Sequence, residues 1–137
     1  MLPQDHFLIS AAAAVPAAMV FALQSHISLL NLALISGVVS AAIDLDVIFL
    51  IYLKGGQYPP MRLFYNPIKI FTRFKLFMDT FAESGLLKVA MISHMVIFFA
   101  LPALAYLFLP AYFLPVVVAS VTHFLCDIPN LRRLRRT

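Results

Sequence analysis

The chain has 137 residues, of which 63% are hydrophobic and only 12% charged, and its mean hydropathy is +0.96. Soluble domains carry about 25% charged residues, so this composition excludes a soluble globular protein and predicts an integral membrane protein. The net charge is +4, but the cations flank apolar segments, which indicates membrane anchoring and argues against a nucleic-acid-binding surface. The length suits one membrane-embedded domain, residues 1–137, with about four spans of roughly 20 residues.

The first apolar segment, residues 7–23, is long enough to span a bilayer. A cleaved signal peptide is the rival interpretation, but no Lys or Arg precedes the segment and Pro16 interrupts its middle. The density of alanine predicts close packing against neighbouring helices, because small side chains let backbones approach. His6 lies at the mouth of this span.

The second predicted span, residues 27–53, contains two carboxylates, Asp44 and Asp46. Gly37, Ser40 and Asp44 recur at helical spacing, so one closely packed face carries a carboxylate into the bundle. Residues i and i+2 of a regular helix point about 200° apart. Asp44 and Asp46 can therefore meet at one site only if the helix is distorted or if other helices surround both faces.

The segment from Lys54 to Gly85 is polar and basic and contains Gly and Pro breakers. Asn66 as an N-cap and Pro67 at the first helical position predict a helix start. Over residues 67–83 the charged side chains fall opposite an apolar arc made of Ile70, Phe71, Phe74, Phe77, Met78 and Phe81. This pattern predicts one amphipathic interfacial helix, which would lie beside the entrance of a functional site in the bundle and present lipid to it.

Residues 86–109 and 111–128 complete the predicted fold, which is all-α: a membrane bundle of four transmembrane helices plus one amphipathic interfacial helix. Four spans place both termini and the basic loop at 54–85 on the same side. All ten Lys and Arg residues then fall on that side, which the positive-inside rule makes cytoplasmic. We therefore expect a multi-pass membrane protein with both termini in the cytoplasm.

The last span carries His123 and Asp127 one helical turn apart, so both project from one face about 6 Å apart. An ionisable residue inside a membrane helix is unfavourable unless it is paired, and it marks a functional site by default. Three interpretations stay open: a shared metal ion, an Asp127 that only orients a metal-bound His123, and a hydrogen bond that joins helices. Cys126 is a free thiol whose role is open, and such residues usually behave as small apolar ones.

Several polar residues fall at similar depth below the cytoplasmic boundary. Counting from the flanking cations at 1.5 Å per residue gives depths of roughly 7 to 14 Å. His26 is not part of this layer, because it falls on the opposite side of the membrane. This shared layer predicts a metal site whose ligands come from His6, Asp44, Asp46, His94, His123 and Asp127. Nitrogen and carboxylate ligands suit zinc, or alternatively manganese or iron. Asp44 or Asp46, whichever is not coordinated, would be the catalytic base.

Four motifs follow one another along the chain: His6, Asp44-Leu45-Asp46, Ser93-His94, and Thr122-His123-Phe124-Leu125-Cys126-Asp127. Their order resembles that of the small membrane-bound metal-dependent hydrolases that are similar to zinc-dependent phospholipase C. The resemblance covers most of the chain and implies a helical membrane fold, a His/Asp metal cluster and hydrolysis of a phosphoester, including lipid ones. Where that family often has a His after the second Asp, this chain has Val47.

We therefore expect a metal-dependent hydrolase that acts on a small phosphoester or a membrane lipid at the cytoplasmic face. Two other classes stay open. Intramembrane carboxylates and histidines also mark metal-ion or proton transport, and the same residues could lock the bundle of a non-catalytic assembly subunit. The sequence leaves the oligomeric state open.

Overall fold

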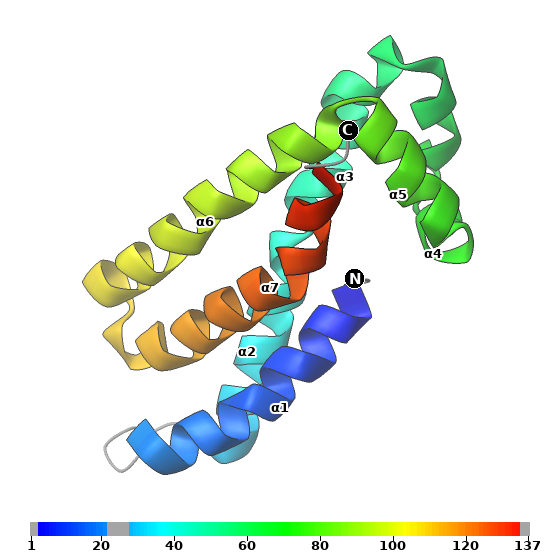
Figure 1. Ribbon diagram of the computed structural model, residues 1–137. Helices are drawn as coiled ribbons and strands as arrows, with labels where there is room; N and C mark the ends of the chain where they lie inside the picture. The colour runs from blue at the N-terminus through cyan, green and yellow to red at the C-terminus, as the bar shows by residue number, and fades with distance from the viewer. Residues whose placement is uncertain (1–2, 22–27, 135–137) are drawn as a thin grey trace.

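The computed structural model describes residues 3–21 and 28–134, and almost all of them are helical. The long helices α1 (Pro3–Phe21), α2 (Leu29–Ile43), α6 (Leu86–Phe108) and α7 (Phe113–Leu134) form a bundle (Figure 1). Helix α3 (Leu45–Lys54) continues α2 beyond a break at Asp44. The prediction of an all-α fold is confirmed.

Helices α1, α2 and α7 pack closely around small side chains. Helix α1 lies along α2 and α7, and α7 also packs against α2 and α6. Ala14 and Ala18 are buried against Leu32 and Val118. This is the close packing predicted from the alanine-rich segment, and it allows two backbones to approach where side chains are small.

Three helical segments are long and apolar enough to cross a membrane: Leu29–Gln57, Leu86–Phe108 and Pro110–Asn130. They correspond to the second, third and fourth predicted spans. Helix α1, with 19 residues, is not among the three, so the first span stays a prediction. Large apolar side chains such as Val38, Val96 and Phe99 are well exposed on α2 and α6, as expected for surfaces that face lipid.

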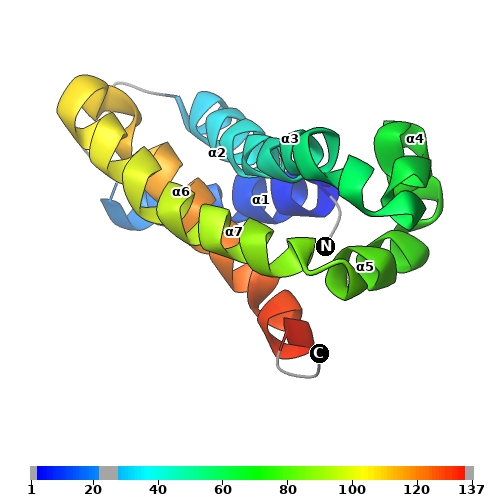
Figure 2. The same cartoon turned by 90° about the horizontal axis from the view of Figure 1, so that it is seen from above.

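The segment between α3 and α6 forms an arm at one end of the bundle (Figure 2). It contains the short 3₁₀ helices η2 (Gly55–Gln57) and η3 (Pro59–Tyr65), followed by α4 (Pro67–Thr72) and α5 (Phe74–Glu83). The Oδ1 atom of Asn66 accepts a hydrogen bond from the backbone N–H of Ile68 at 3.0 Å, so the helix begins at the predicted cap.

The predicted single helix over 67–83 is in fact two helices, because the backbone leaves the helical region at Arg73 (φ −127°, ψ 41°). The break lets both helices turn their apolar sides toward one core, which contains Ile70, Phe77, Met78 and Phe81 together with residues of α3, η3 and α6. Met78 and Phe81 are buried in this core and face the protein, whereas Phe71 is 44% exposed. The interfacial location of this segment stays a prediction.

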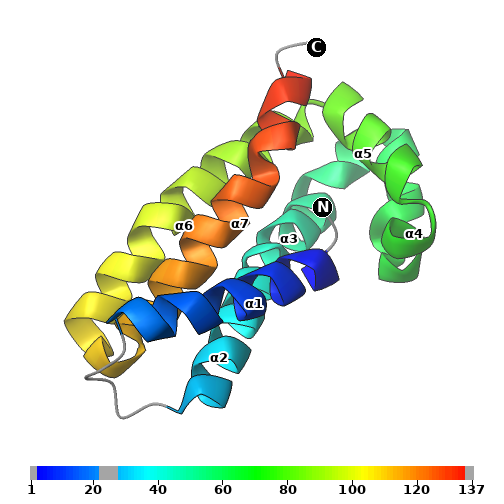
Figure 3. The ribbon, with the colours of Figure 1, turned by 60° about the horizontal axis from the view of Figure 1, so that its bottom comes forward.

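The beginning of α1, the end of α7 and the arm lie at the same end of the bundle, as Figures 1 and 3 show. The opposite end contains the last turn of α1, the first turn of α2 and η4 (Pro110–Tyr112), which connects α6 to α7. Polar residues near the start of α1 and α6 and near the end of α2 and α7 are therefore brought to one level.

Candidate metal centre

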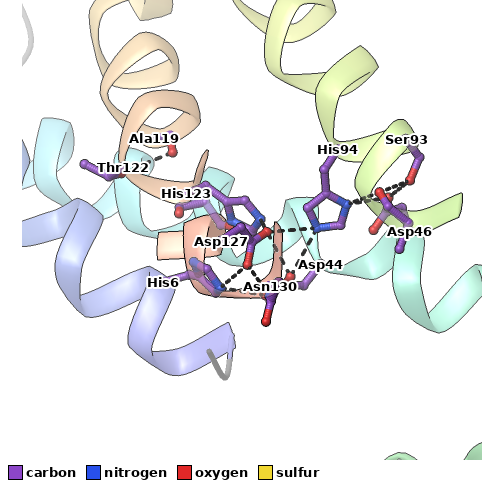
Figure 4. A network of polar contacts seen from close by, with 12 residues as sticks. His6, Asp44, Asp46, Ser93, His94, Ala119, Thr122, His123, Asp127 and Asn130 are labelled. Atoms are coloured by element: carbon purple, nitrogen blue, oxygen red, sulfur yellow. Dashed lines mark hydrogen bonds and ion pairs between the residues drawn. The ribbon is translucent and has the colours of Figure 1, made fainter. Parts of the chain in front are cut away.

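Five ionisable side chains from four helical regions converge near the arm end of the bundle (Figure 4). We call this set the candidate metal centre: His6 of α1, Asp44 at the α2–α3 junction, His94 of α6, and His123 and Asp127 of α7. The three histidines and Asp127 are at most 7% exposed. The carboxylate of Asp44 is 16% exposed. Buried ionisable side chains are normally paired with one another or bound to a metal.

The Nε2 atoms of the three histidines lie 3.4 to 3.8 Å from carboxylate oxygens of Asp44 and Asp127. The Nε2 atom of His6 lies 3.8 Å from both Asp44 and Asp127, and that of His94 lies 3.6 Å from both. The Nε2 atom of His123 lies 3.7 Å from Asp44 and 3.4 Å from Asp127. Direct hydrogen bonds would be about 2.7–3.2 Å, whereas ligands held at 2.0–2.1 Å by a tetrahedral ion lie about 3.4 Å apart. The spacing therefore fits ligands around a cation better than it fits direct hydrogen bonds.

A hydrogen bond on the outer side of the His123 ring sets its tautomer. The Nδ1 atom of His123 lies 2.8 Å from the carbonyl oxygen of Ser40, so Nδ1 carries the proton and Nε2 presents a lone pair to the centre. In a continuous helix that carbonyl would accept from the N–H of Asp44, but here this N–H bonds to the carbonyl of Ala42. The break at Asp44 thus supplies the acceptor that orients His123.

Several side-chain atoms of this centre's residues are buried without a hydrogen-bond partner. They are Nδ1 and Nε2 of His6, Nε2 of His123 and Oδ2 of Asp44. Leaving a buried polar group unpaired costs about 1–3 kcal/mol, so four such atoms on three neighbouring residues call for a partner. The rings of His6 and His123 are stacked at 4.1 Å between centroids. That contact suits two neutral rings that both offer nitrogen ligands.

Among the described residues, two groups of three side chains have ligand atoms within 4.8 Å of one another: His6, His123 and Asp127, and Asp44, His94 and His123. His123 belongs to both groups. Their donors are imidazole nitrogens and carboxylate oxygens, which zinc and several other divalent transition ions accept. Buried His/Asp clusters that could hold a metal ion are therefore present in this chain.

Asp46 lies outside this centre and contacts His94 from the other side. Its Oδ2 atom is 3.0 Å from Nδ1 of His94, and it also accepts a hydrogen bond from the hydroxyl of Ser93. Nε2 of His94 faces Asp44 instead. The opposed directions of Asp44 and Asp46 thus place the two carboxylates on the two nitrogens of one imidazole ring.

Two contacts at the centre were not predicted from the sequence. The side-chain amide of Asn130 donates to Oδ1 of Asp127 at 2.8 Å, and the Ser40 carbonyl binds His123. The spacing of Asn130, three residues after Asp127, was a usable signal for the first contact. A backbone carbonyl released by a helix break has no signature in the residue types. Cys126 is partly buried and belongs to neither group, and His26 lies outside the described residues.

Comparisons of the chain with protein-family models, with curated proteins and with solved structures found no match. Any conclusion about function must therefore come from the geometry of the candidate metal centre and its surroundings.

Proposed function

We propose that this protein is a membrane-embedded metal-dependent hydrolase that cleaves a phosphoester at the cytoplasmic face. The observation that carries the proposal is the convergence of three imidazole Nε2 atoms on two carboxylates at 3.4 to 3.8 Å. If these side chains only joined the helices through direct hydrogen bonds, the nitrogen–oxygen distances would be about 2.7–3.2 Å.

We assign the metal-binding role to His6, His94, His123 and Asp127, and the role of general base to Asp44. Asn130 fixes one oxygen of Asp127, while Asp44 is the more exposed of the two aspartates and has a buried oxygen without a hydrogen-bond partner. A zinc ion bound here would polarise a phosphoester oxygen and bring the pKa of a water molecule near 7. Asp46 keeps the proton of His94 on Nδ1, so that Nε2 stays available.

The chain's own residues account for the proton in hydrolysis. Water attacks phosphorus, and Asp44 accepts the proton that water loses as the new P–O bond forms. The bond from phosphorus to the leaving oxygen breaks, and the leaving alcohol takes a proton from Asp44. The step needs no oxidant, reductant or co-reactant besides water.

The proposed topology has four spans, with the arm, the start of α1 and the end of α7 in the cytoplasm. In support, α1 exposes large apolar side chains, including Leu8, Met19 and Val20, each at least 63% exposed. Six cations belong to the arm or to the helix ends beside it: Lys54, Arg62, Lys69, Arg73, Lys75 and Lys88. A positively charged end of a bundle faces the cytoplasm.

The buried polar residues support transport of ions or protons less well than they support hydrolysis. Among the buried residues that the structure describes, the ionisable ones are all members of the metal centre. In the other half of the bundle, the buried hydroxyl of Ser36 is bonded to the carbonyl of Pro115 at 3.1 Å, and Asn31 is exposed on the outside of α2. A pathway for ions or protons should continue across the membrane, and these residues offer no such continuation.

Elemental analysis of protein purified without chelator tests the proposal. We expect stoichiometric zinc in wild-type protein and hydrolysis of bis(p-nitrophenyl) phosphate that a chelator abolishes. The Asp44→Asn variant should keep the metal and lose most of its activity, whereas Asp127→Asn should lose both. The proposal fails if the purified protein binds no divalent ion.

A further inference from the structure

We propose that the substrate carries a single hydrocarbon chain, and that this chain lies in a cavity between the arm and the metal centre. The inference rests on the proposed function and names the class of its substrate. The cavity has a volume of about 70 Å³, and its wall includes Asp44, His94 and Asp127 of the metal centre. Apart from Pro3 of α1 and Asn130 of α7, the rest of the wall is apolar and comes from α3, α4, α5 and α6.

The cavity wall and the metal centre share helix faces. On α6, the cavity-lining residues Leu87, Ala90, Met91 and His94 recur at intervals of three, one and three residues, so they form one face. At the start of α3, Asp44, Val47 and Ile48 recur at intervals of three and one residues. A molecule whose polar group lies at His94 and Asp44 therefore meets apolar side chains of the same two faces directly beyond them.

Helix α5 closes the other side of the cavity with a row of aromatic rings. Phe74, Phe77 and Phe81 project from one face, with ring centroids 6.4 and 5.2 Å apart along the row. Phe71 of α4 also lines the cavity and is 44% exposed, so the cavity wall reaches the protein surface at this residue. A chain can enter there from the adjoining lipid while its phosphoester approaches the centre.

The lining decides what kind of group the cavity accepts. A buried water needs about two to four polar partners, and beyond the metal centre the walls formed by α4 and α5 offer only apolar side chains. Hydrocarbon fits such walls, and a polar head group does not. A cavity of about 70 Å³ is several times the roughly 10–15 Å³ of cavity space that a single water needs, which gives room for a segment of one slender chain.

Photo-crosslinking locates the chain independently of catalysis. The probe is dodecyl phosphate with a diazirine near the chain end, added to metal-loaded protein in phosphatidylcholine vesicles. We expect labelled peptides from residues 70–81. Labelling confined to residues 97–104 would place the chain in the groove between α2 and α6 that Ile97, Ala100 and Leu104 line, and would overturn the proposal.

Filling the cavity tests the same point by kinetics. Ile48 is half-buried and lines the cavity, whereas its neighbour Phe49 is 65% exposed and does not line it. Each methylene that enters an apolar site is worth about fourfold in affinity. In wild-type protein we expect kcat/KM for a dodecyl p-nitrophenyl phosphodiester to exceed that for the ethyl ester at least tenfold. Ile48→Trp should bring this ratio down severalfold, and Phe49→Trp should leave it unchanged.

The outcomes separate the two proposals. If the protein binds no metal and hydrolyses neither ester, the proposed function fails. If it binds metal and hydrolyses both esters, but Ile48→Trp and Phe49→Trp give the same ratio, only the chain site fails. Val47→Phe fills the cavity from another position and replaces Ile48→Trp if that variant does not fold. A farnesyl ester distinguishes isoprenoid from unbranched chains, and preference for either over the ethyl ester supports the site.

Discussion

The Oδ2 atom of Asp46 lies 3.0 Å from Nδ1 of His94, while Nε2 of the same ring lies 3.6 Å from both Asp44 and Asp127. The carbonyl of Ala90, 2.8 Å from Nδ1, holds the ring from the same side as Asp46. A carboxylate that binds the outer nitrogen of a ligand histidine fixes the orientation of the ring and raises its basicity. We therefore regard Asp46 as a positioning residue for His94.

The first prediction follows from that position. Asp46→Asn should reduce metal affinity or activity by about 10- to 100-fold, because such outer partners contribute that much, and the site should still fill at higher zinc concentration. Metal titration of the detergent-solubilised variant measures the effect, with the exposed Glu83→Gln as the matched control. Complete loss of binding at saturating zinc would show that Asp46 is itself a ligand.

The second prediction concerns His123 and Asp127, whose Nε2 and Oδ2 atoms are 3.4 Å apart. His123→Ala and Asp127→Ala should each lower metal affinity markedly, and the double variant should lose less than the sum. Residues of one site act as a unit, so their effects on binding free energy are not additive. Isothermal titration of the three variants gives the coupling. Strictly additive losses would mean that the two side chains serve separate sites.

The third prediction distinguishes a metal centre from hydrogen bonds that merely lock the bundle. A ligand that binds only the folded state stabilises it by about 2.7 kcal/mol at 100 times its Kd. Chelation should therefore lower the Tm of the wild type by several degrees but leave that of His123→Ala nearly unchanged. Thermal unfolding in detergent, with and without chelator, measures both. An equal loss of stability by His123→Ala in the two conditions would support the assembly-subunit interpretation instead.

The fourth prediction concerns the contact between α1 and α2. A Cβ atom at Gly37 would lie 2.8 Å from the ring of Phe7 and 3.0 Å from its carbonyl oxygen, so Gly37→Ala must push α1 outward beside His6. Overpacking costs about 1–3 kcal/mol, which outweighs the roughly 0.5–1 kcal/mol by which alanine favours a helix over glycine.

We expect Gly37→Ala to lower both the Tm and the metal affinity, as measured by thermal unfolding and metal titration. Val38→Ala is a suitable control, because Val38 is 58% exposed on the outer side of the same helix. If Gly37→Ala leaves metal affinity unchanged, the position of His6 does not depend on this contact.

The fold and the meeting of the polar residues could be predicted in large part, because they depend on spacing and polarity. The interval between His123 and Asp127 already places both on one face. The depths estimated for Asp46, His94 and His123 put them at one level, where the structure brings them close to one another. Helix continuity was harder to predict. No Gly or Pro lies next to Asp44 or Arg73 to signal a break, yet the helix is interrupted at both positions.

The different positions of Asp44 and Asp46 could not be predicted from residue types. Both are aspartates in the same turn, and the sequence supported either one as a ligand. Their separation depends on the break at Asp44 and on the placement of His94 between the two carboxylates. The burial of Phe81 likewise depends on α5 folding back onto α6, whereas an amphipathic pattern shows only that one side is apolar.

His6 and Asp127 lie at opposite ends of the chain, yet their side chains are 3.8 Å apart. During biosynthesis α1 is made long before α7. The group of His6, His123 and Asp127 therefore cannot exist in a partly synthesised chain. We expect capture of the metal to follow the synthesis and packing of α7, so a chain truncated before α7 should not acquire it.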